Sequence, residues 1–322
     1  MNPSPPRISR CVRLHVHALT VLLFTMLLAG CSQREVSDEP VIVATIFPLA
    51  NLVEQIVGDR AEVICTVPPG MSPHGFEPTA RHMEAIRRAE MVVMVGLNYD
   101  DWARDAKQRY APADAALVVF SEAVGLETHD DHAHHDHDHG HADEHDHGGA
   151  NPHLWLDPVL THQFVEALGS HLAARLGDDD GQLAARTAAL SEEFAEIDRE
   201  YTEALAPYAD AKIITFHNAF DRMVERYGME MAATLTPVDA PGALTSGRVE
   251  RALQVIAEHD VRTVYAEPQF PAEAFRVLEN EAGVRVLILD PLGDPYDSER
   301  DTFQKIMRRN LETLVDGLGA RS

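Results

Sequence analysis

The stretch VIVATIFPLANLVEQIVGDRAEVICTV, residues 41–67, decides the fold class. Residues 41–46 are an apolar, β-branched run that predicts a strand, and residues 49–57 have a helical pattern that ends at Gly58. Residues 61–67 predict a second strand. A helix between two strands is the connection that parallel pairing requires, so the stretch predicts a βαβ unit and an α/β protein.

The same alternation continues along the chain and predicts two (βα)n lobes with parallel sheets. In the first half it predicts a helix at 79–90, for which Thr79 is a suitable N-cap, and strands at 91–95 and 117–120. In the second half it predicts strands at 213–216, 229–235, 261–266 and 284–289, and helices that end near 227 and that span 246–258, 272–281 and 302–318.

Two helical patterns lie between these halves, at 159–176 and at 182–206. The second pattern keeps one apolar face, made by Leu183, Leu190, Phe194, Ile197, Tyr201 and Leu205. A helix of about 25 residues is about 37 Å long at 1.5 Å per residue. We therefore expect a backbone helix that runs along both lobes, joins them and limits their hinge motion.

The N-terminus has the pattern of a secretory signal. Three Arg precede an apolar run at 18–29, which is too short to span a membrane, and no acidic residue occurs before Glu35. The run ends in Leu-Ala-Gly before Cys31, which resembles a bacterial lipobox, although an ordinary signal peptide with an incidental Cys is the alternative. We expect a periplasmic or otherwise extracytoplasmic protein that is anchored to a bacterial membrane by lipid on Cys31.

These patterns divide the chain into segments. We expect a signal peptide at 1–30, a tether at 31–40, an N-terminal α/β lobe at 41–158 with a His/Asp-rich loop at 127–150, a helical linker at 159–207 and a C-terminal α/β lobe at 208–322. We expect the chain to be a monomer.

The charge of the chain excludes two classes of partner. The 322 residues include 52 acidic and 27 basic residues, which gives a formal charge of −25. Binding to nucleic acid needs clustered Lys and Arg, and the chain has only three Lys, which also argues against a polybasic membrane-binding patch.

Residues 129–147, HDDHAHHDHDHGHADEHDH, contain half of the 18 His of the chain. The tract has no apolar residue larger than Ala, so we expect it to be mobile. Imidazole favours Zn, Cu and Ni, so the tract predicts an auxiliary, low-affinity metal loop, the alternative being a solvated acidic loop. Its candidate ligands are His129, His132, His134, His135, His137, His139, His141, His145 and His147.

Four other motifs carry candidate ligands. His74 lies in a Pro- and Gly-rich loop that follows the second predicted strand, and His153 lies in NPHLWLDP at 151–158. His217 follows the first strand of the second half, and Asp290 follows the last strand. In the second motif, Asp157 is placed to accept a hydrogen bond that would fix an imidazole tautomer.

Open α/β sheets bind ligands at the carboxyl ends of their strands. If the two sheets face each other, His74, His153, His217 and Asp290 meet in a cleft between the lobes. Three imidazoles and one carboxylate form a four-coordinate shell that suits Zn²⁺, whereas more carboxylate would favour Mn²⁺.

These motifs also carry a resemblance to a known family. The chain resembles the periplasmic zinc-uptake solute-binding proteins of ABC transporters, the ZnuA type of metal-binding lipoproteins, over its whole mature length. The resemblance rests on PHGFEP at 73–78, the His/Asp-rich insertion, NPHLWLDP at 151–158, FHNAF at 216–220, PGAL at 241–244, AEPQF at 266–270 and LDPLG at 289–293.

The resemblance implies that His74, His153 and His217 ligate transported Zn²⁺, and that Asp290 is a candidate fourth ligand that water can replace. His217 favours zinc, because manganese-binding relatives tend to carry a carboxylate there. It further implies high-affinity zinc import through an ABC permease, without turnover chemistry. One departure is that no Cys follows residue 65, whereas some zinc-type members have a disulfide in the C-terminal half.

Other ionisable residues have simpler interpretations. Glu267 ends a predicted strand, and we expect a structural or cleft-lining role because the ligand set is complete without it. His82, His162, His171 and His259 lie in helical patterns and are expected to pack or face solvent.

Three alternatives remain open at this point. Within the same class, the protein could bind manganese or nickel. A secreted zinc hydrolase is also compatible with three His and an open position, although HExxH, GxSxG and GxGxxG are absent. A metal-buffering adhesin is the third alternative.

Overall fold

The computed structural model describes residues 39–126, 150–235, 246–259 and 261–319. The signal peptide, Cys31, most of the tether, the His/Asp-rich tract and residues 236–245, which include the PGAL motif, lie outside the described residues. The described residues from 39 onward belong to one compact unit.

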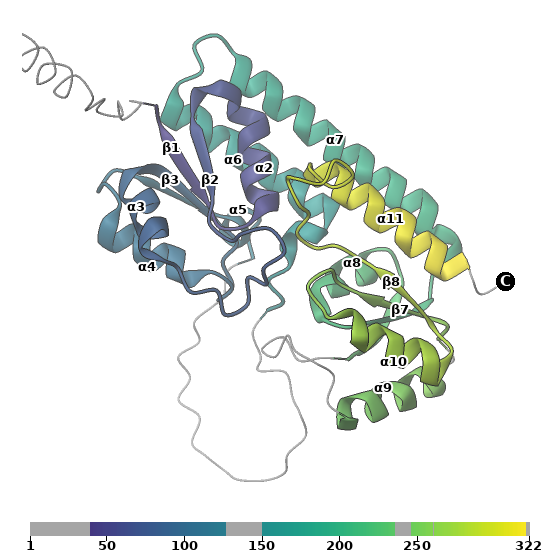
Figure 1. Cartoon of the computed structure of the whole chain (residues 1–322). Coiled ribbons are helices and arrows are strands. Elements are labelled where there is room, and N and C mark those ends of the chain that lie inside the picture. The colour runs from purple at the N-terminus through teal and green to yellow at the C-terminus, as the bar shows by residue number, and fades with distance from the viewer. Residues whose placement is uncertain (1–38, 127–149, 236–245, 260, 320–322) are drawn as a thin grey trace, which may run out of the picture. The chain divides into compact units, whose positions relative to one another are not determined.

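Two four-stranded parallel sheets form the framework (Figure 1). The first sheet has the order β2-β1-β3-β4 and the second has the order β6-β5-β7-β8, so the two halves repeat one topology. Their strands are β1 (Val41–Ala44), β2 (Glu62–Cys65), β3 (Ala89–Met94), β4 (Ala116–Val119), β5 (Lys212–Thr215), β6 (Glu230–Thr234), β7 (Thr263–Ala266) and β8 (Arg285–Ile288). The predicted α/β class and the two parallel sheets are confirmed.

The helices cover both faces of the sheets. They are α2 (Phe47–Val57), α3 (Ala80–Arg88), α4 (Asp101–Tyr110), α5 (Phe120–Ala123), α6 (Pro158–Leu176), α7 (Gln182–Leu205), α8 (Asp221–Arg226), α9 (Ser246–His259), α10 (Ala272–Ala282) and α11 (Phe303–Gly319). Helix α4 is an addition to the sequence-based prediction, which had no helix between 95 and 117. Ala103 and Ala106 are the only buried residues of this strongly charged helix, so the hydrophobic pattern in its sequence is weak.

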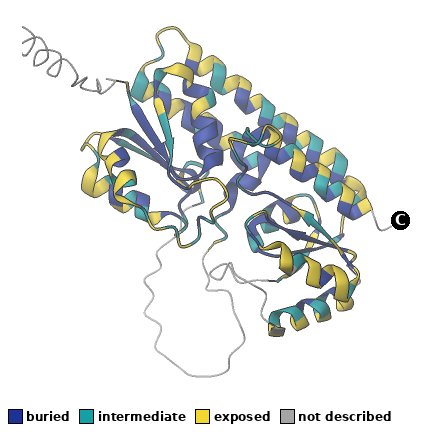
Figure 2. Ribbon diagram, viewed as in Figure 1, coloured by how far each residue is buried: buried dark blue, intermediate teal, exposed yellow. Residues whose placement is uncertain are grey.

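Side-chain alternation assigns the two faces of each sheet to different cores. On β1, Val41 and Val43 pack in a cluster with α3 and α4, whereas Ile42 and Ala44 pack in a cluster with α2, α6 and α7. Successive residues of a strand point to opposite faces, which explains this division. All four residues of β1 are buried (Figure 2), as expected for a parallel strand with helices on both sides.

The long helix α7 connects the cores of the two lobes. Its predicted apolar face is confirmed, because Leu183, Leu190, Phe194, Ile197, Tyr201 and Leu205 are all buried. One continuous cluster contains this face together with Ile42 of β1, Ile213 of β5 and Leu314 of α11. The two lobes therefore share apolar packing along α7 (Figure 1).

Candidate metal centre

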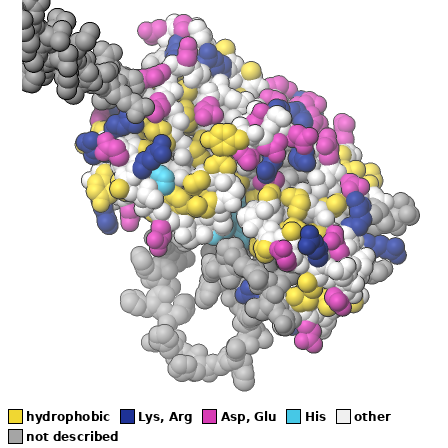
Figure 3. Space-filling model, in the orientation of Figure 1, with side chains coloured by type: hydrophobic (Ala, Val, Ile, Leu, Met, Phe, Trp, Pro, Cys, Tyr) yellow, Lys and Arg dark blue, Asp and Glu magenta, His cyan; other side chains and the backbone are white. Residues whose placement is uncertain are grey.

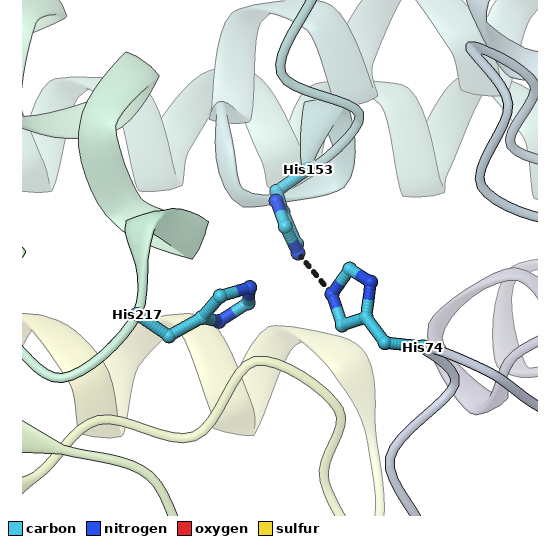
Figure 4. Close-up of side chains that lie close together, drawn as sticks. All are labelled: His74, His153 and His217. Atoms are coloured by element: carbon cyan, nitrogen blue, oxygen red, sulfur yellow. Dashed lines mark hydrogen bonds between the residues drawn. The ribbon is translucent and has the colours of Figure 1, made fainter. Parts of the chain in front are cut away.

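Three imidazoles meet between the lobes. His74 comes from the loop after β2, His153 from the turn that leads into α6, and His217 from the loop directly after β5. Their rings point toward a common centre (Figure 4). The space-filling view shows histidine side chains where the two lobes meet (Figure 3). The carboxyl ends of β2 and β5 thus supply two of the three rings, as the strand-end argument predicts.

The spacing of the ring nitrogens is that of a metal site. One nitrogen from each of the three residues lies within 4.8 Å of the others. The Nε2 atoms of His74 and His153 are 3.3 Å apart. In a tetrahedral zinc site with Zn–N bonds of 2.0–2.1 Å, two nitrogen ligands are about 3.3 Å apart. The Nε2 atoms of His74 and His153 are therefore at the spacing of two zinc ligands, and His217 supplies a third nitrogen close to both.

The chain positions each ring differently. The loop that carries His74 turns at Gly70 and Gly75, which have φ of 74° and 73°, and this ring is half-buried. His153 and His217 are buried, with exposed fractions of 2% and 5%. Next to His153, the indole Nε1 of Trp155 donates to the carbonyl of Pro291 at 2.7 Å, which anchors this turn to the C-terminal lobe.

Two other residues lie at hydrogen-bond distance from ring nitrogens of the triad, which is the group His74, His153 and His217. The Oδ1 atom of Asn151 is 2.8 Å from Nδ1 of His153, and Oε1 of Glu267 is 2.9 Å from Nδ1 of His217. An acceptor at Nδ1 holds the proton there and leaves the Nε2 lone pair for a metal. The Nε2 atom of His217 is buried and has no hydrogen-bond partner among the described residues. Both fixed rings therefore offer Nε2 to the centre.

The environment keeps His153 neutral. Burial lowers the pKa of His153 well below its usual range, and the nearby His217 and His74 rings lower it further. Tyr99 packs edge-on against His74 and also contacts His153, with ring centroids 5.1 and 5.7 Å away. Burial raises the pKa of Tyr99, and the carboxylates of Asp100 and Glu267 raise it further, so Tyr99 is a neutral wall of the site. A neutral imidazole is the form that ligates a metal.

The structure keeps Asp290 out of the group of donors that lie within 4.8 Å of one another. Its Oδ2 atom pairs with Nη1 of Arg300 at 2.6 Å, and its Oδ1 atom accepts the backbone N–H groups of Leu292 and Gly293. Arg300, which comes from the loop after β8, therefore neutralises this carboxylate in the structure. The role of Asp290 as a fourth ligand that water can replace stays a prediction.

The expectation for Asp157 is wrong. This carboxylate caps α6 by accepting from the backbone N–H groups of Val159 and Leu160, and it pairs with Arg226 at 2.6 Å. The group next to Nδ1 of His153 is instead Oδ1 of Asn151, which is two residues before His153 in the same motif. The sequence signal was an amide next to a Pro-His pair, and it is weak by itself.

The remaining candidates fall into two groups. His82, His162 and His259 form hydrogen bonds at helices, to the backbone of Thr79, to the carbonyl of Ser191 and to Lys212, and the exposed His171 lies outside the triad. The nine His of the 129–147 tract lie outside the described residues. Within the described part of the chain, His74, His153 and His217 are the only group of three or more His, Cys, Asp or Glu residues whose ligand atoms lie within 4.8 Å of one another.

Comparisons with known proteins find relatives among zinc-uptake and zinc-binding proteins. A family model described as zinc-uptake complex component A, periplasmic, matches residues 42–317. Zinc-binding protein AdcA of Streptococcus pyogenes serotype M3 is 26% identical over 307 residues, which is 92% of this chain and 59% of AdcA. The chain thus spans about three fifths of the length of that relative.

A second relative and one crystal structure match at nearly full length. The high-affinity zinc uptake system protein ZnuA of Bacillus subtilis is 26% identical over 88% of this chain and 89% of its own. The Zn(II)-bound ZnuA-like domain of Streptococcus pneumoniae AdcA superposes with a TM-score of 0.70 at 23% identity, covering 87% of this chain and 99% of that domain. The two-lobed fold predicted from the sequence is confirmed by this likeness.

Proposed function

The chain belongs to the family of periplasmic A components of zinc-uptake complexes. We therefore propose that it captures Zn²⁺ outside the cytoplasmic membrane and delivers it to an ABC permease. His74, His153 and His217 are the proposed ligands, and a water molecule takes the fourth position. The observation that carries the proposal is the 3.3 Å separation of two Nε2 atoms, with the third imidazole within 4.8 Å.

The donor set supports zinc over manganese. Imidazole suits Zn²⁺, whereas Mn²⁺ prefers carboxylate, carbonyl and water oxygens. The carboxylates of Glu267 and Asp290 are both engaged by other side chains. Glu267 accepts from His217 and Gln269, and Asp290 is paired with Arg300. Neither of these two carboxylates is then free to supply the oxygen ligands that Mn²⁺ prefers.

The surroundings of the site support transport over hydrolysis. A zinc hydrolase needs a general base beside the metal-bound water. The Glu267 side chain is only 3% exposed, and both of its oxygens are used in hydrogen bonds. Tyr99 is neutral and buried. We therefore propose a binding protein with no catalytic activity.

Other parts of the chain bear on how the protein is held at the membrane and how it gathers zinc. Among the described residues, none of the helices combines the length and apolar character that a membrane crossing needs. We propose that lipid on Cys31 anchors the protein, that the 129–147 tract gathers metal with low affinity, and that the protein acts as a monomer. These three proposals rest on the sequence patterns alone.

Metal competition on the metal-free chain tests the proposal. A chelator that strips the His/Asp-rich tract should leave one tight zinc site per chain, and excess Mn²⁺ should not displace this zinc. His217→Ala should abolish the tight site, whereas the exposed His171→Ala should leave it unchanged. Displacement by Mn²⁺, or zinc-dependent hydrolysis that is lost in His217→Ala, would replace the proposal with one of its alternatives. Normal growth in zinc-starved medium after deletion of the gene would argue against import.

A further inference from the structure

The side-chain amide of Asn151 bonds to both of the segments that carry the buried rings. Its Oδ1 atom accepts from the backbone N–H of His153 at 3.0 Å and lies 2.8 Å from Nδ1 of the same residue. Its Nδ2 atom donates to the carbonyl oxygen of Asn218 at 2.7 Å. Asn218 directly follows His217, so one amide spans the two lobes at the site.

Two backbone groups fix the orientation of this amide. A backbone N–H can only donate and a backbone carbonyl can only accept. The oxygen of Asn151 must therefore face the N–H of His153, and its nitrogen must face the carbonyl of Asn218. Reversing the amide would place two donors together and two acceptors together.

The orientation of the amide decides the tautomer of His153. Since the atom 2.8 Å from Nδ1 is an oxygen without a proton, Nδ1 must carry the proton and donate it. The lone pair of the neutral ring is then on Nε2, which lies 3.3 Å from Nε2 of His74. Without Asn151, a neutral imidazole could place its proton on Nε2 and block the metal.

The second bond of the amide acts on the opposite lobe. The carbonyl of Asn218 belongs to the turn at residues 218–220, which begins directly after His217. Holding this turn sets where the His217 ring stands relative to His153, and their ring centroids are 4.7 Å apart. Pro152 restricts the backbone of Asn151 to extended conformations, which helps to keep the amide in place.

We propose that Asn151 is a positioning residue of the metal site, which holds His153 in the Nδ1-protonated tautomer and sets the distance between the two buried imidazoles. The proposal rests on the proposed function for its consequence in zinc binding, but its structural content concerns the metal-free protein. Residues that orient a metal ligand typically contribute 10–100-fold to metal affinity.

Two variants and a matched control separate the two bonds. Asn151→Ala removes both bonds, whereas Asn151→Asp keeps an acceptor at Nδ1 of His153 and loses the donor to Asn218. Asn280→Ala makes the same truncation at an exposed position of α10. The readouts are zinc affinity by chelator competition and ¹⁵N NMR of labelled His in the metal-free chain, with the His153 signal assigned by its loss in His153→Gln.

We expect the unmodified chain and Asn280→Ala to show His153 protonated at Nδ1. Asn151→Ala should lose this fixed tautomer and bind zinc about 10–100-fold more weakly. Asn151→Asp should restore the tautomer, which a merely structural role would not require. Should Asn151→Ala fail to fold, the unmodified chain and Asn151→Asp still decide the tautomer.

An Nε2-protonated His153 in the unmodified chain would overturn the proposal, and so would an Asn151→Ala chain with unchanged tautomer and affinity. Absence of a tight zinc site in the unmodified chain would instead contradict the proposed function, while the NMR result would still test the role of Asn151. The two failures are therefore distinguishable.

Discussion

Oε1 of Glu267 lies 2.9 Å from Nδ1 of His217, and both side chains are almost completely buried, with exposed fractions of 3% and 6%. Gln269 donates to the other oxygen of the same carboxylate. Glu267 directly follows strand β7 of the second lobe, which lies next to β5, the strand that leads to His217. A hydrogen-bonded carboxylate behind a histidine ring fixes its orientation and raises its basicity as a metal ligand.

This pair predicts the effect of neutralising Glu267. Glu267→Gln should retain a hydrogen bond to His217 but lose the charge, and Glu267→Ala should lose both. We expect zinc affinity to fall modestly in the first variant and about 10–100-fold in the second, measured by chelator competition. Glu273→Gln, at an exposed position of α10, is the control. Equal affinities in all of these chains would show that the carboxylate does not act on the ligand.

The depressed pKa of His153 predicts a loss of stability in weak acid. The pKa of an unfolded His is about 6.5, whereas burial keeps folded His153 neutral to much lower pH. Below pH 6.5 the unfolded chain therefore binds more protons than the folded chain, and stability falls as the pH falls. Urea unfolding of the metal-free chain should show this contribution, with a slope of at most about 1.4 kcal/mol per pH unit.

The control for this experiment is a chain in which the ring is absent. His153→Gln should lose less stability than the unmodified chain between about pH 7.5 and pH 5.5, because the imidazole titrates in this range and the amide of Gln does not. His171→Gln, at an exposed position, should behave as the unmodified chain. Parallel pH profiles for all three chains would contradict the assignment. Zinc affinity should also fall over this range, because protonated imidazoles cannot ligate.

The ion pair between Asp157 and Arg226 predicts a stability effect at the start of α6. Asp157 is fully buried and Arg226 is one third exposed, with 2.6 Å between Oδ2 and Nη2. Arg226→Met leaves a buried carboxylate without its cationic partner, and we expect the free energy of unfolding to drop by about 1.5–3 kcal/mol. Urea unfolding measures it, and Arg251→Met, on the exposed face of α9, is the control. A change no larger than in the control would mean that water replaces the guanidinium.

Deletion of residues 129–147 separates the tract from the triad. We expect the shortened chain to bind fewer zinc ions in total and to retain one tight site, because His74, His153 and His217 lie outside the tract. Isothermal titration with Zn²⁺ gives both the number of ions and the affinity. If the tight site disappeared with the tract, the tract would be the primary source of ligands and the triad assignment would be wrong.

The sequence by itself determined the regular elements and one edge of the site. Apolar, β-branched runs and period-3.6 apolar patterns are local properties, and they predicted each described strand and the buried face of α7 to within a few residues. Parallel sheets place the residues that follow β2 and β5 at corresponding edges, which brought His74 and His217 into one hypothesis. Helix α4 was not predicted, because alanines supply its buried face in an otherwise charged segment.

Only the tertiary structure decided which polar group meets which. The sequence predicts Asp290 as a candidate fourth ligand and Asp157 as an acceptor for an imidazole, and the structure shows that the two carboxylates pair with Arg300 and Arg226. Asn151 and Glu267, by contrast, reach Nδ1 of His153 and of His217. The physical reason is that a hydrogen bond or ion pair depends on distances of a few tenths of an ångström between segments far apart in the chain, and no local periodicity encodes them.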